Sequence, residues 1–256
     1  LILGDIPPSA AELANKLDTH LIWMSNFGWD DIYEKFPSPF DQYTQKYKEQ
    51  YSKGGYLLRF PFSLKMNWQI EEVSVGLISA NPKKLTHKFL NHISSTNKPL
   101  VLVCFGGIGV EFDYSLYKLW PDITFLEFSS KTFEKEKNNK GLFNVVTIPF
   151  PFRALDLIPY CSRVICKPGF STFCEAISNR VGVHAVNRDG FPESNSLTRG
   201  LQDYAFHRLL SRQSFMSGEW ELDKLLIPPS KKNLISKDGA YFSAQKIIEF
   251  IIKNFN

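Results

Sequence analysis

The chain contains 256 residues, of which 43% are hydrophobic and 22% charged, and its formal net charge is +4 at pH 7. This length and hydrophobic content suffice for one large or two small domains with packed cores. The mild positive charge lacks the dense stripe of Lys and Arg that is typical of nucleic-acid binding, so we expect no nucleic-acid partner. It is compatible with anionic ligands and with a weak peripheral contact to a membrane surface.

Cysteine usage and hydropathy indicate a cytoplasmic protein. The four cysteines form no CxxC pair, and three lie in or beside apolar segments typical of a core. They are Cys104, Cys161, Cys166 and Cys174. Buried free thiols are typical of a reducing compartment, and no apolar run reaches the roughly 18–20 residues that span a bilayer. We therefore expect a cytoplasmic location.

The first third of the chain alternates short apolar strands with amphipathic helices. Strands are predicted over 1–3, 20–24, 56–60 and 73–77, and helices over 9–17 and 40–51. Ser9 and Glu12 have the spacing of a capping box at the start of the first helix. Because the chain has no initiator Met and its first residues already have the pattern of a buried strand, we expect further residues to precede it in the natural protein.

A segment dense in aromatic and polar side chains, residues 25–33, follows the second predicted strand. It contains Asn26, Trp29 and Asp30 and is predicted to be a loop. One interpretation is a turn with a hydrophobic staple, and the other is a cleft wall that offers stacking and hydrogen bonds.

The remaining two thirds continue the same alternation after a linker at 81–84. Strands are predicted over 99–105, 123–128, 144–148, 163–166 and 183–186, and helices after 152, after 170, over 197–204 and through 244–251. Strands that alternate with helices favour parallel sheets with helices on both faces. Such sheets bind ligands at the carboxyl ends of their strands.

A glycine-rich turn directly follows the most apolar of these strands. Gly106, Gly107 and Gly109 would let backbone amides approach a phosphate closely. The sequence is not a full GxGxxG motif, and Glu111 and Asp113 are unfavourable beside an anion. A simple tight turn is therefore an equally good interpretation.

The stretch 163–175 has the pattern of a short buried strand, a Pro-Gly turn and a helix start. Thr172 and Glu175 have the spacing of a capping box. The first N–H groups of a helix have no intrahelical partner, and its dipole places partial positive charge there, so a diphosphate could bind at this turn. The alternative is the ordinary turn that every strand–helix unit needs.

Taken together, these segments resemble the GT-B glycosyltransferases, in the branch that contains the UDP-glucuronosyl/glycosyl transferases and the MurG-like enzymes. The resemblance extends to the glycosyltransferase-like domain at the front of L-arabinokinase-type sugar kinases. It rests on residues 25–33, 105–109, 167–172 with Glu175, 191–194 and 238–240. It implies an α/β fold of two Rossmann-like domains whose parallel sheets face a cleft, the N-terminal one incomplete. The corresponding ranges are 1–82, 83–237 and, for a helix that packs back across the domains, 238–256.

The resemblance also implies roles for individual residues. The C-terminal domain would bind a nucleotide-sugar donor, with a UDP-linked sugar as the expectation and no further cofactor. The diphosphate would lie between the glycine turn and the helix start, the Glu175 carboxylate would accept hydrogen bonds from the ribose, and Glu193 and Ser194 would contact the sugar. The expected donor-binding residues are Gly106, Gly107, Gly109, Lys167, Gly169, Phe170, Ser171, Thr172, Glu175, Arg188, Glu193 and Ser194, and those of the acceptor-side cleft are Asn26 and Trp29. The Glu-Ser pair departs from the Asp-Gln or Glu-Gln pair of relatives.

The implied reaction is transfer of the sugar to an acceptor hydroxyl without a metal ion. The five His residues are scattered and no Asp-x-Asp occurs, so no metal-ligand cluster is predicted. Lys167 or Arg188 and the helix N–H groups would stabilise the departing diphosphate. Relatives usually supply the base from an earlier part of the N-terminal domain; within this chain, Asp5 and Asp30 are candidates. A non-catalytic nucleotide-sugar-binding module and a nucleotide-sugar epimerase are the alternatives.

Overall fold

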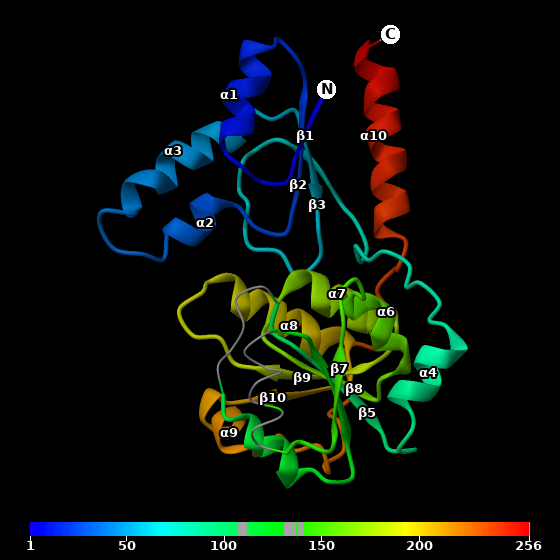
Figure 1. Ribbon diagram of the computed structural model, residues 1–256. Coiled ribbons are helices and arrows are strands. Elements are labelled where there is room, and N and C mark those ends of the chain that lie inside the picture. Colours follow the sequence, from blue (N-terminus) through cyan, green and yellow to red (C-terminus); the bar gives the residue numbers. More distant parts are fainter. Residues whose placement is uncertain (107–111, 131–136, 138–140, 256) are drawn as a thin grey trace. The chain divides into compact units, whose positions relative to one another are not determined.

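The computed structural model describes residues 1–106, 112–130, 137 and 141–255 (Figure 1). The described residues form two compact units. Unit 1 comprises Leu1–Ser79, Asp189–Gly200 and Asn233–Asn256, and unit 2 comprises Ala80–Arg188 and Leu201–Lys232. Compared with the predicted ranges, residues 189–200 and 233–237 therefore group with the first part of the chain.

Unit 1 is built on a four-stranded parallel sheet with the order β1-β2-β3-β4. Its strands are β1 (Ile2–Gly4), β2 (Leu21–Ser25), β3 (Tyr56–Arg59) and β4 (Glu71–Ser74), and its helices are α1 (Ser9–Lys16), α2 (Trp29–Tyr33), α3 (Asp41–Tyr51) and α10 (Gly239–Phe255). Because successive side chains of a strand point to opposite faces, Trp23 of β2 packs with Tyr51 and Trp68, whereas Ile22 packs toward Phe250 of α10. Helices thus cover both faces of this sheet, α1 and α3 on one side and α10 on the other (Figure 1).

Arg59, the last residue of β3, fixes the loop that follows it. Its guanidinium pairs with Glu72 on the neighbouring strand at 2.7 Å and donates hydrogen bonds to the carbonyl oxygens of Leu64 and Met66. Phe62, Met66 and Gln69 have positive φ angles of 60°, 45° and 54°. Non-glycine residues rarely adopt this conformation, so the Arg59 hydrogen bonds help to hold a strained backbone in place.

Unit 2 contains a six-stranded parallel sheet with the order β10-β9-β8-β5-β6-β7. Its strands are β5 (Leu100–Cys104), β6 (Thr124–Phe128), β7 (Val145–Ile148), β8 (Arg163–Cys166), β9 (Gly182–Val186) and β10 (His207–Leu210). Its helices are α4 (His87–Ile93), α6 (Ala154–Leu157), α7 (Phe170–Ser178) and α9 (Arg212–Ser217), with the 3₁₀ turns η1 (Tyr114–Leu119) and η2 (Ile158–Tyr160). Helix α8 (Glu193–Tyr204) begins in unit 1 and ends in unit 2.

A fully buried histidine joins two parts of unit 2. His184 of β9 donates its Nδ1–H to the Trp220 carbonyl oxygen at 2.9 Å, and its Nε2 accepts from Arg163 at 2.9 Å. Burial, and then the Arg163 charge, lower the pKa of His184 to about 4. The imidazole is therefore neutral in the folded protein at physiological pH.

Both predicted capping boxes are wrong. Helix α7 begins at Phe170 with Gly169 at its N-cap, so Thr172 lies inside the first turn and no side chain caps the helix. Helix α1 likewise begins at Ser9 itself, after Pro8, without a side-chain cap. In both helices the residue that precedes the predicted cap already has helical geometry, which leaves no N-cap role for a hydroxyl inside the helix.

Other differences concern short or polar elements. Residues 25–33, predicted as a loop, contain α2, and α8 begins at Glu193 instead of Leu197. The elements α4, β10 and α9 were not predicted. Among the described residues, no helix combines the length and the apolar character needed to cross a membrane.

Candidate functional site

The loops after β5, β8 and β9 lie at one edge of the sheet in unit 2. Cys104 of β5 is in register with Cys166 of β8, which is in register with Ala185 of β9. The strand order reverses at β5, which pairs with β8 on one side and β6 on the other. In open parallel sheets such a reversal marks the ligand-binding crevice. Gly106 and the turn at 167–169 thus occupy the predicted position.

Gly106 and Lys167 approach each other at this edge. Gly106 has a φ of 72°, which favours glycine, and a Cβ built on it would lie 3.9 Å from the Lys167 Nζ. The Lys167 ammonium is therefore close to the glycine backbone, where both can face an anion. Gly107 and Gly109, the other two predicted phosphate contacts, lie outside the described residues.

The start of α7 presents an approachable helix end. Gly169 has an extended conformation, and the first intrahelical bond runs from the Phe173 N–H to its carbonyl oxygen at 3.0 Å. Among the described residues, a Cβ on Gly169 would meet only the Lys167 carbonyl oxygen within 4 Å, at 3.8 Å. Ser171 is exposed and Thr172 half-buried. The N–H groups and dipole at this helix end, three residues after Lys167 in the sequence, favour an anion.

Glu175 lies one turn further along α7, on the same helix as the anion-binding end. Its side chain is half-buried and forms no hydrogen bond or ion pair with another described residue. Burial raises the pKa of its carboxyl, Asp156 adds to this, and the Arg153 guanidinium opposes it. Arg153 is itself oriented by Asp156, whose Oδ2 accepts from Nε at 2.9 Å. The unpaired carboxyl is thus available to hydroxyl donors of a ligand.

Asn26, Glu193 and Ser194 come together in unit 1 through a contact between residues 167 positions apart. The Asn26 Nδ2 donates to the Glu193 Oε1 at 2.8 Å. All three side chains are buried, with exposed fractions of 4%, 8% and 4%. The Ser194 Oγ has no hydrogen-bond partner among the described residues. From the sequence, Asn26 was predicted to line the acceptor side of the cleft, and Glu193 and Ser194 were predicted to contact the donor sugar.

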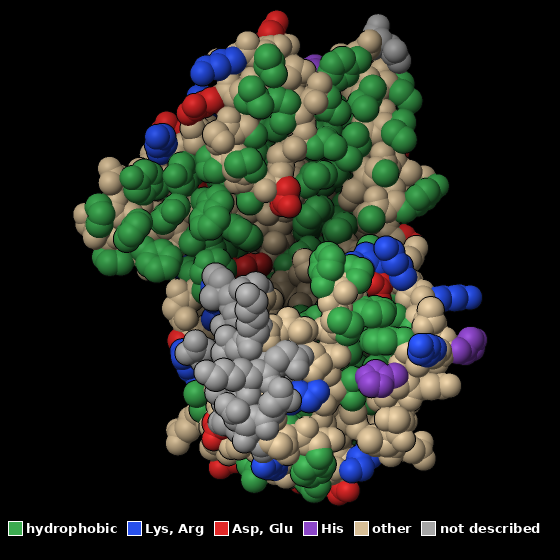
Figure 2. All heavy atoms as spheres, in the orientation of Figure 1, with side chains coloured by type: hydrophobic (Ala, Val, Ile, Leu, Met, Phe, Trp, Pro, Cys, Tyr) green, Lys and Arg blue, Asp and Glu red, His purple; other side chains and the backbone are tan. Residues whose placement is uncertain are grey.

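Asp30 and Trp29 belong to an aromatic region of unit 1. Asp30 is 5% exposed, and its Oδ2 accepts from the Trp68 indole N–H at 3.0 Å. Burial raises the pKa of Asp30 to about 6, while the Trp68 hydrogen bond opposes the shift. Trp29 is half-buried and packs edge-on against Phe27, in a group of rings that continues over α2 and α3 on the hydrophobic surface of Figure 2. Asp5, the other candidate base, is exposed.

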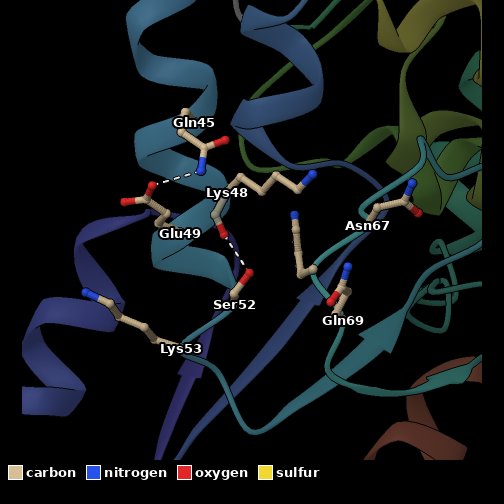
Figure 3. Close-up of a pocket in the computed structure, with 8 residues that line it drawn as sticks. Gln45, Lys48, Glu49, Ser52, Lys53, Asn67 and Gln69 are labelled. Atoms are coloured by element: carbon tan, nitrogen blue, oxygen red, sulfur yellow. Dashed lines mark hydrogen bonds between the residues drawn. The ribbon is translucent and has the colours of Figure 1, made fainter.

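Among the described residues, a groove in each unit lies away from the candidate site residues. That of unit 1 has a volume of about 570 Å³ and a polar lining that includes Lys48, Lys53 and Gln69 (Figure 3). That of unit 2, about 610 Å³, is lined by the stacked rings of Phe89 and Phe152, 4.1 Å apart. Neither groove is lined by a predicted site residue.

Two residues at the carboxyl edge of unit 2 were not singled out from the sequence. Phe150, which follows β7, exposes 95% of its surface. Cys104 is the last residue of β5. Burial raises the pKa of its thiol, the Glu175 charge raises it further, and the Lys167 charge lowers it. Arg188, a predicted donor contact, is exposed just after β9. The sequence signal for Phe150 is its place between Pro149 and Pro151, directly after the predicted strand 144–148.

Metal-binding groups were also sought. Within the part of the chain that the structure describes, no cluster of three or more His, Cys, Asp or Glu side chains could hold a metal ion. Transfer without a metal stays an expectation of the sequence.

The fold of the two sheets is that of the GT-B glycosyltransferases, which confirms the predicted class. Arabidopsis thaliana UGT89C1 has a TM-score of 0.58 at 12% identity, over 88% of this chain and 58% of that one. The spinosyn forosaminyltransferase SpnP has a TM-score of 0.56 at 14% identity, over 84% of this chain and 64% of that one. Likeness at this identity shows the fold alone.

One curated protein is similar in sequence. The L-arabinokinase of Arabidopsis thaliana is 24% identical over 229 residues, which are 86% of this chain and 21% of that protein. No protein-family model matches the chain. The chain therefore spans about a fifth of this relative and less than two thirds of the two solved structures.

Proposed function

We propose that the chain binds a nucleotide-sugar donor, with UDP as the nucleotide, and takes part in transfer of the sugar to an acceptor hydroxyl. The observation that carries this proposal is the convergence of Gly106, Lys167 and the start of α7 at the strand-order reversal of unit 2. The structure of UGT89C1 complexed with UDP-L-rhamnose supports the donor class, because that protein shares the fold.

Each part of the donor would meet a group suited to it. The diphosphate would accept hydrogen bonds from the N–H groups of Ser171 and Thr172 and lie close to the Lys167 ammonium. The Glu175 carboxylate would accept hydrogen bonds from the ribose hydroxyls. The exposed ring of Phe150 would stack on the base, since aromatic side chains offer a face to any nucleobase.

The same groups would promote departure of the diphosphate. As the bond between the anomeric carbon and the phosphate oxygen breaks, negative charge grows on that oxygen. The Lys167 ammonium and the helix N–H groups stabilise this charge, which lowers the barrier without a metal ion. A base must take the proton of the acceptor hydroxyl, and Asp30, with a pKa of about 6, has a basicity suited to that step near neutral pH.

Isothermal titration with UDP tests the donor assignment. Glu175→Gln keeps the size of the side chain and removes its charge, so we expect about tenfold weaker UDP binding, as for a lost charge-assisted hydrogen bond. Glu219→Gln, an exposed acid of unit 2, is the matched control and should bind as the wild type does. Equal affinities for wild type and Glu175→Gln would remove the ribose role. Absence of any UDP binding would overturn the proposal.

A turnover assay separates transfer from the alternatives. Incubation with UDP-sugars should yield UDP and a glycosylated or hydrolysed product. An isomerised UDP-sugar would indicate an epimerase instead, and UDP-sugar binding without any product would indicate a binding module.

A further inference from the structure

The segment of unit 1 that contains α2 and α3 carries a continuous array of aromatic rings. Each ring centroid in it lies within 6.1 Å of at least one other. We call this set the ring array; its members are Phe27, Trp29, Tyr33, Phe36, Phe40, Tyr43 and Tyr47. Tyr33 lies at its centre, with the rings of Tyr43 and Tyr47 at 5.6 and 5.7 Å. Because aromatic pairs at these separations attract one another, the rings hold α2 and α3 together.

The ring array is anchored in the core at one end and exposed at the other. Phe27, Trp29 and Tyr47 pack against the core of unit 1. Phe40, directly before α3, leaves 45% of its surface exposed, and its ring is stacked on that of Tyr33 with 6° between the two planes. Figure 2 shows hydrophobic side chains gathered over α2 and α3. Contiguous exposed surface of this kind commonly marks a binding site.

The composition of this surface argues against a membrane, a nucleic acid or a protein as its partner. Between residues 27 and 53, Ile32 is the only Leu, Ile, Val or Met, and it is 2% exposed. Helices that bind membranes present aliphatic side chains beside their rings, and protein interfaces favour Met and Arg, which residues 27–53 lack. Residues 33–49 contain three acidic and three basic side chains, so no net charge attracts anionic lipids or phosphates.

Flat rings combined with hydroxyl and amide groups suit a sugar chain. A sugar ring has a face of C–H bonds and a rim of hydroxyls, so it can stack on an aromatic ring and form hydrogen bonds at its edge. Burial, and then the neighbouring Tyr33 and Tyr43 hydroxyls, raise the pKa of Tyr47, so the three hydroxyls lie close together. Gln42, one residue before Tyr43, adds an exposed amide. The exposed part of the ring array therefore offers both kinds of contact.

We propose that the ring array binds a neutral oligosaccharide whose sugars are joined through equatorial bonds, such as a β-1,4-linked chain. Such a chain is extended and flat, so successive sugars present their C–H faces to successive rings, with Phe40 as the outermost contact. The tyrosine hydroxyls and the Gln42 amide form hydrogen bonds to the sugar hydroxyls. This site lies wholly within unit 1 and is independent of the proposed donor site in unit 2, so a failure of UDP to bind would leave it in place.

Isothermal titration of the full 256-residue chain with cellohexaose tests this inference. The wild type should bind it, and glucose, which covers a single ring, should bind at least about tenfold more weakly. Phe40→Ala should weaken cellohexaose binding about tenfold, as expected for the loss of one stacking partner. Tyr241→Ala is the matched control, because it removes a ring of α10 that is 68% exposed and lies outside the array, and it should leave the affinity unchanged.

A second variant guards against misfolding of the first. Tyr43→Phe keeps the ring and removes the hydroxyl, so the melting temperature should stay that of the wild type while cellohexaose binding weakens about threefold. Absence of cellohexaose binding by the wild type, or equal affinities for wild type and Phe40→Ala, would overturn the inference. Binding of vesicles of phosphatidylcholine and phosphatidylserine that is lost in Phe40→Ala would also overturn it, because the ring array would then contact a lipid surface.

Discussion

His184 should make the stability of unit 2 depend on pH between 6.5 and 4. The imidazole is fully buried and neutral, and its folded pKa is about 4, against about 6.5 in an unfolded chain. As the pH falls below 6.5, the unfolded chain takes up a proton that the folded chain cannot accept until about pH 4. The folded state therefore loses up to about 1.4 kcal/mol per pH unit in this window, or roughly 3 kcal/mol in all.

The measurement is urea unfolding, followed by tryptophan fluorescence, at a series of pH values from 7.5 to about 4, compared between wild type and His184→Gln. The glutamine has no proton to gain, so the variant should be less stable at pH 7.5 but lose about 3 kcal/mol less than the wild type on acidification. Ile165→Val, at the position in register with His184, is the control: it should cost about 1 kcal/mol at every pH. Parallel curves for wild type and His184→Gln would refute the assigned pKa and the role of burial.

Two further substitutions test local geometry. Gly106→Ala should destabilise unit 2 by about 1 kcal/mol in thermal unfolding, because its φ of 72° strains any other residue although the added Cβ meets no atom closer than 3.9 Å among the described residues. A neutral effect would show that this backbone relaxes readily. Trp68→Phe removes the donor to Asp30, so the pKa of that carboxyl should rise further above about 6 in a carbon-detected NMR titration. An unchanged Asp30 titration would mean that the indole hydrogen bond contributes little.

Much of the architecture was predictable because short apolar strands and glycine turns are local signals. Strand β5 is a continuous apolar run, β8 has one after Arg163, and in β9 only His184 interrupts the apolar residues. Such runs occur where a parallel sheet is covered on both faces. The four-residue strand β10 contains one Arg and one His, and its pairing with β9 is set by tertiary contacts. The start of α8 did have a local signal, since Pro192 directly precedes Glu193 and proline is frequent at helix starts.

Only those parts of the candidate site whose residues lie close together in the sequence could be predicted. Lys167, Gly169 and Glu175 belong to one strand–turn–helix unit, so their proximity follows from chain connectivity. The contact of Asn26 with Glu193 does not, because 167 positions separate them and neither residue is unusual in its own segment. The two capping-box predictions were wrong although the residue spacing fits the motif. Both helices begin earlier in the sequence than the motif requires, with Pro8 and Gly169 as their N-cap residues.

The conformation of the loop at 60–70 depends in part on Arg59, which lies outside the loop at the end of β3. Its strained backbone is held by a guanidinium at the end of the preceding strand, which pairs with Glu72 just beyond the loop. Replacement of Arg59 should therefore loosen the first part of the loop, while Trp68, which donates to Asp30, keeps its end attached to the core. The conformation of this loop thus depends on one side chain from the preceding strand together with the loop's own buried Met66 and Trp68.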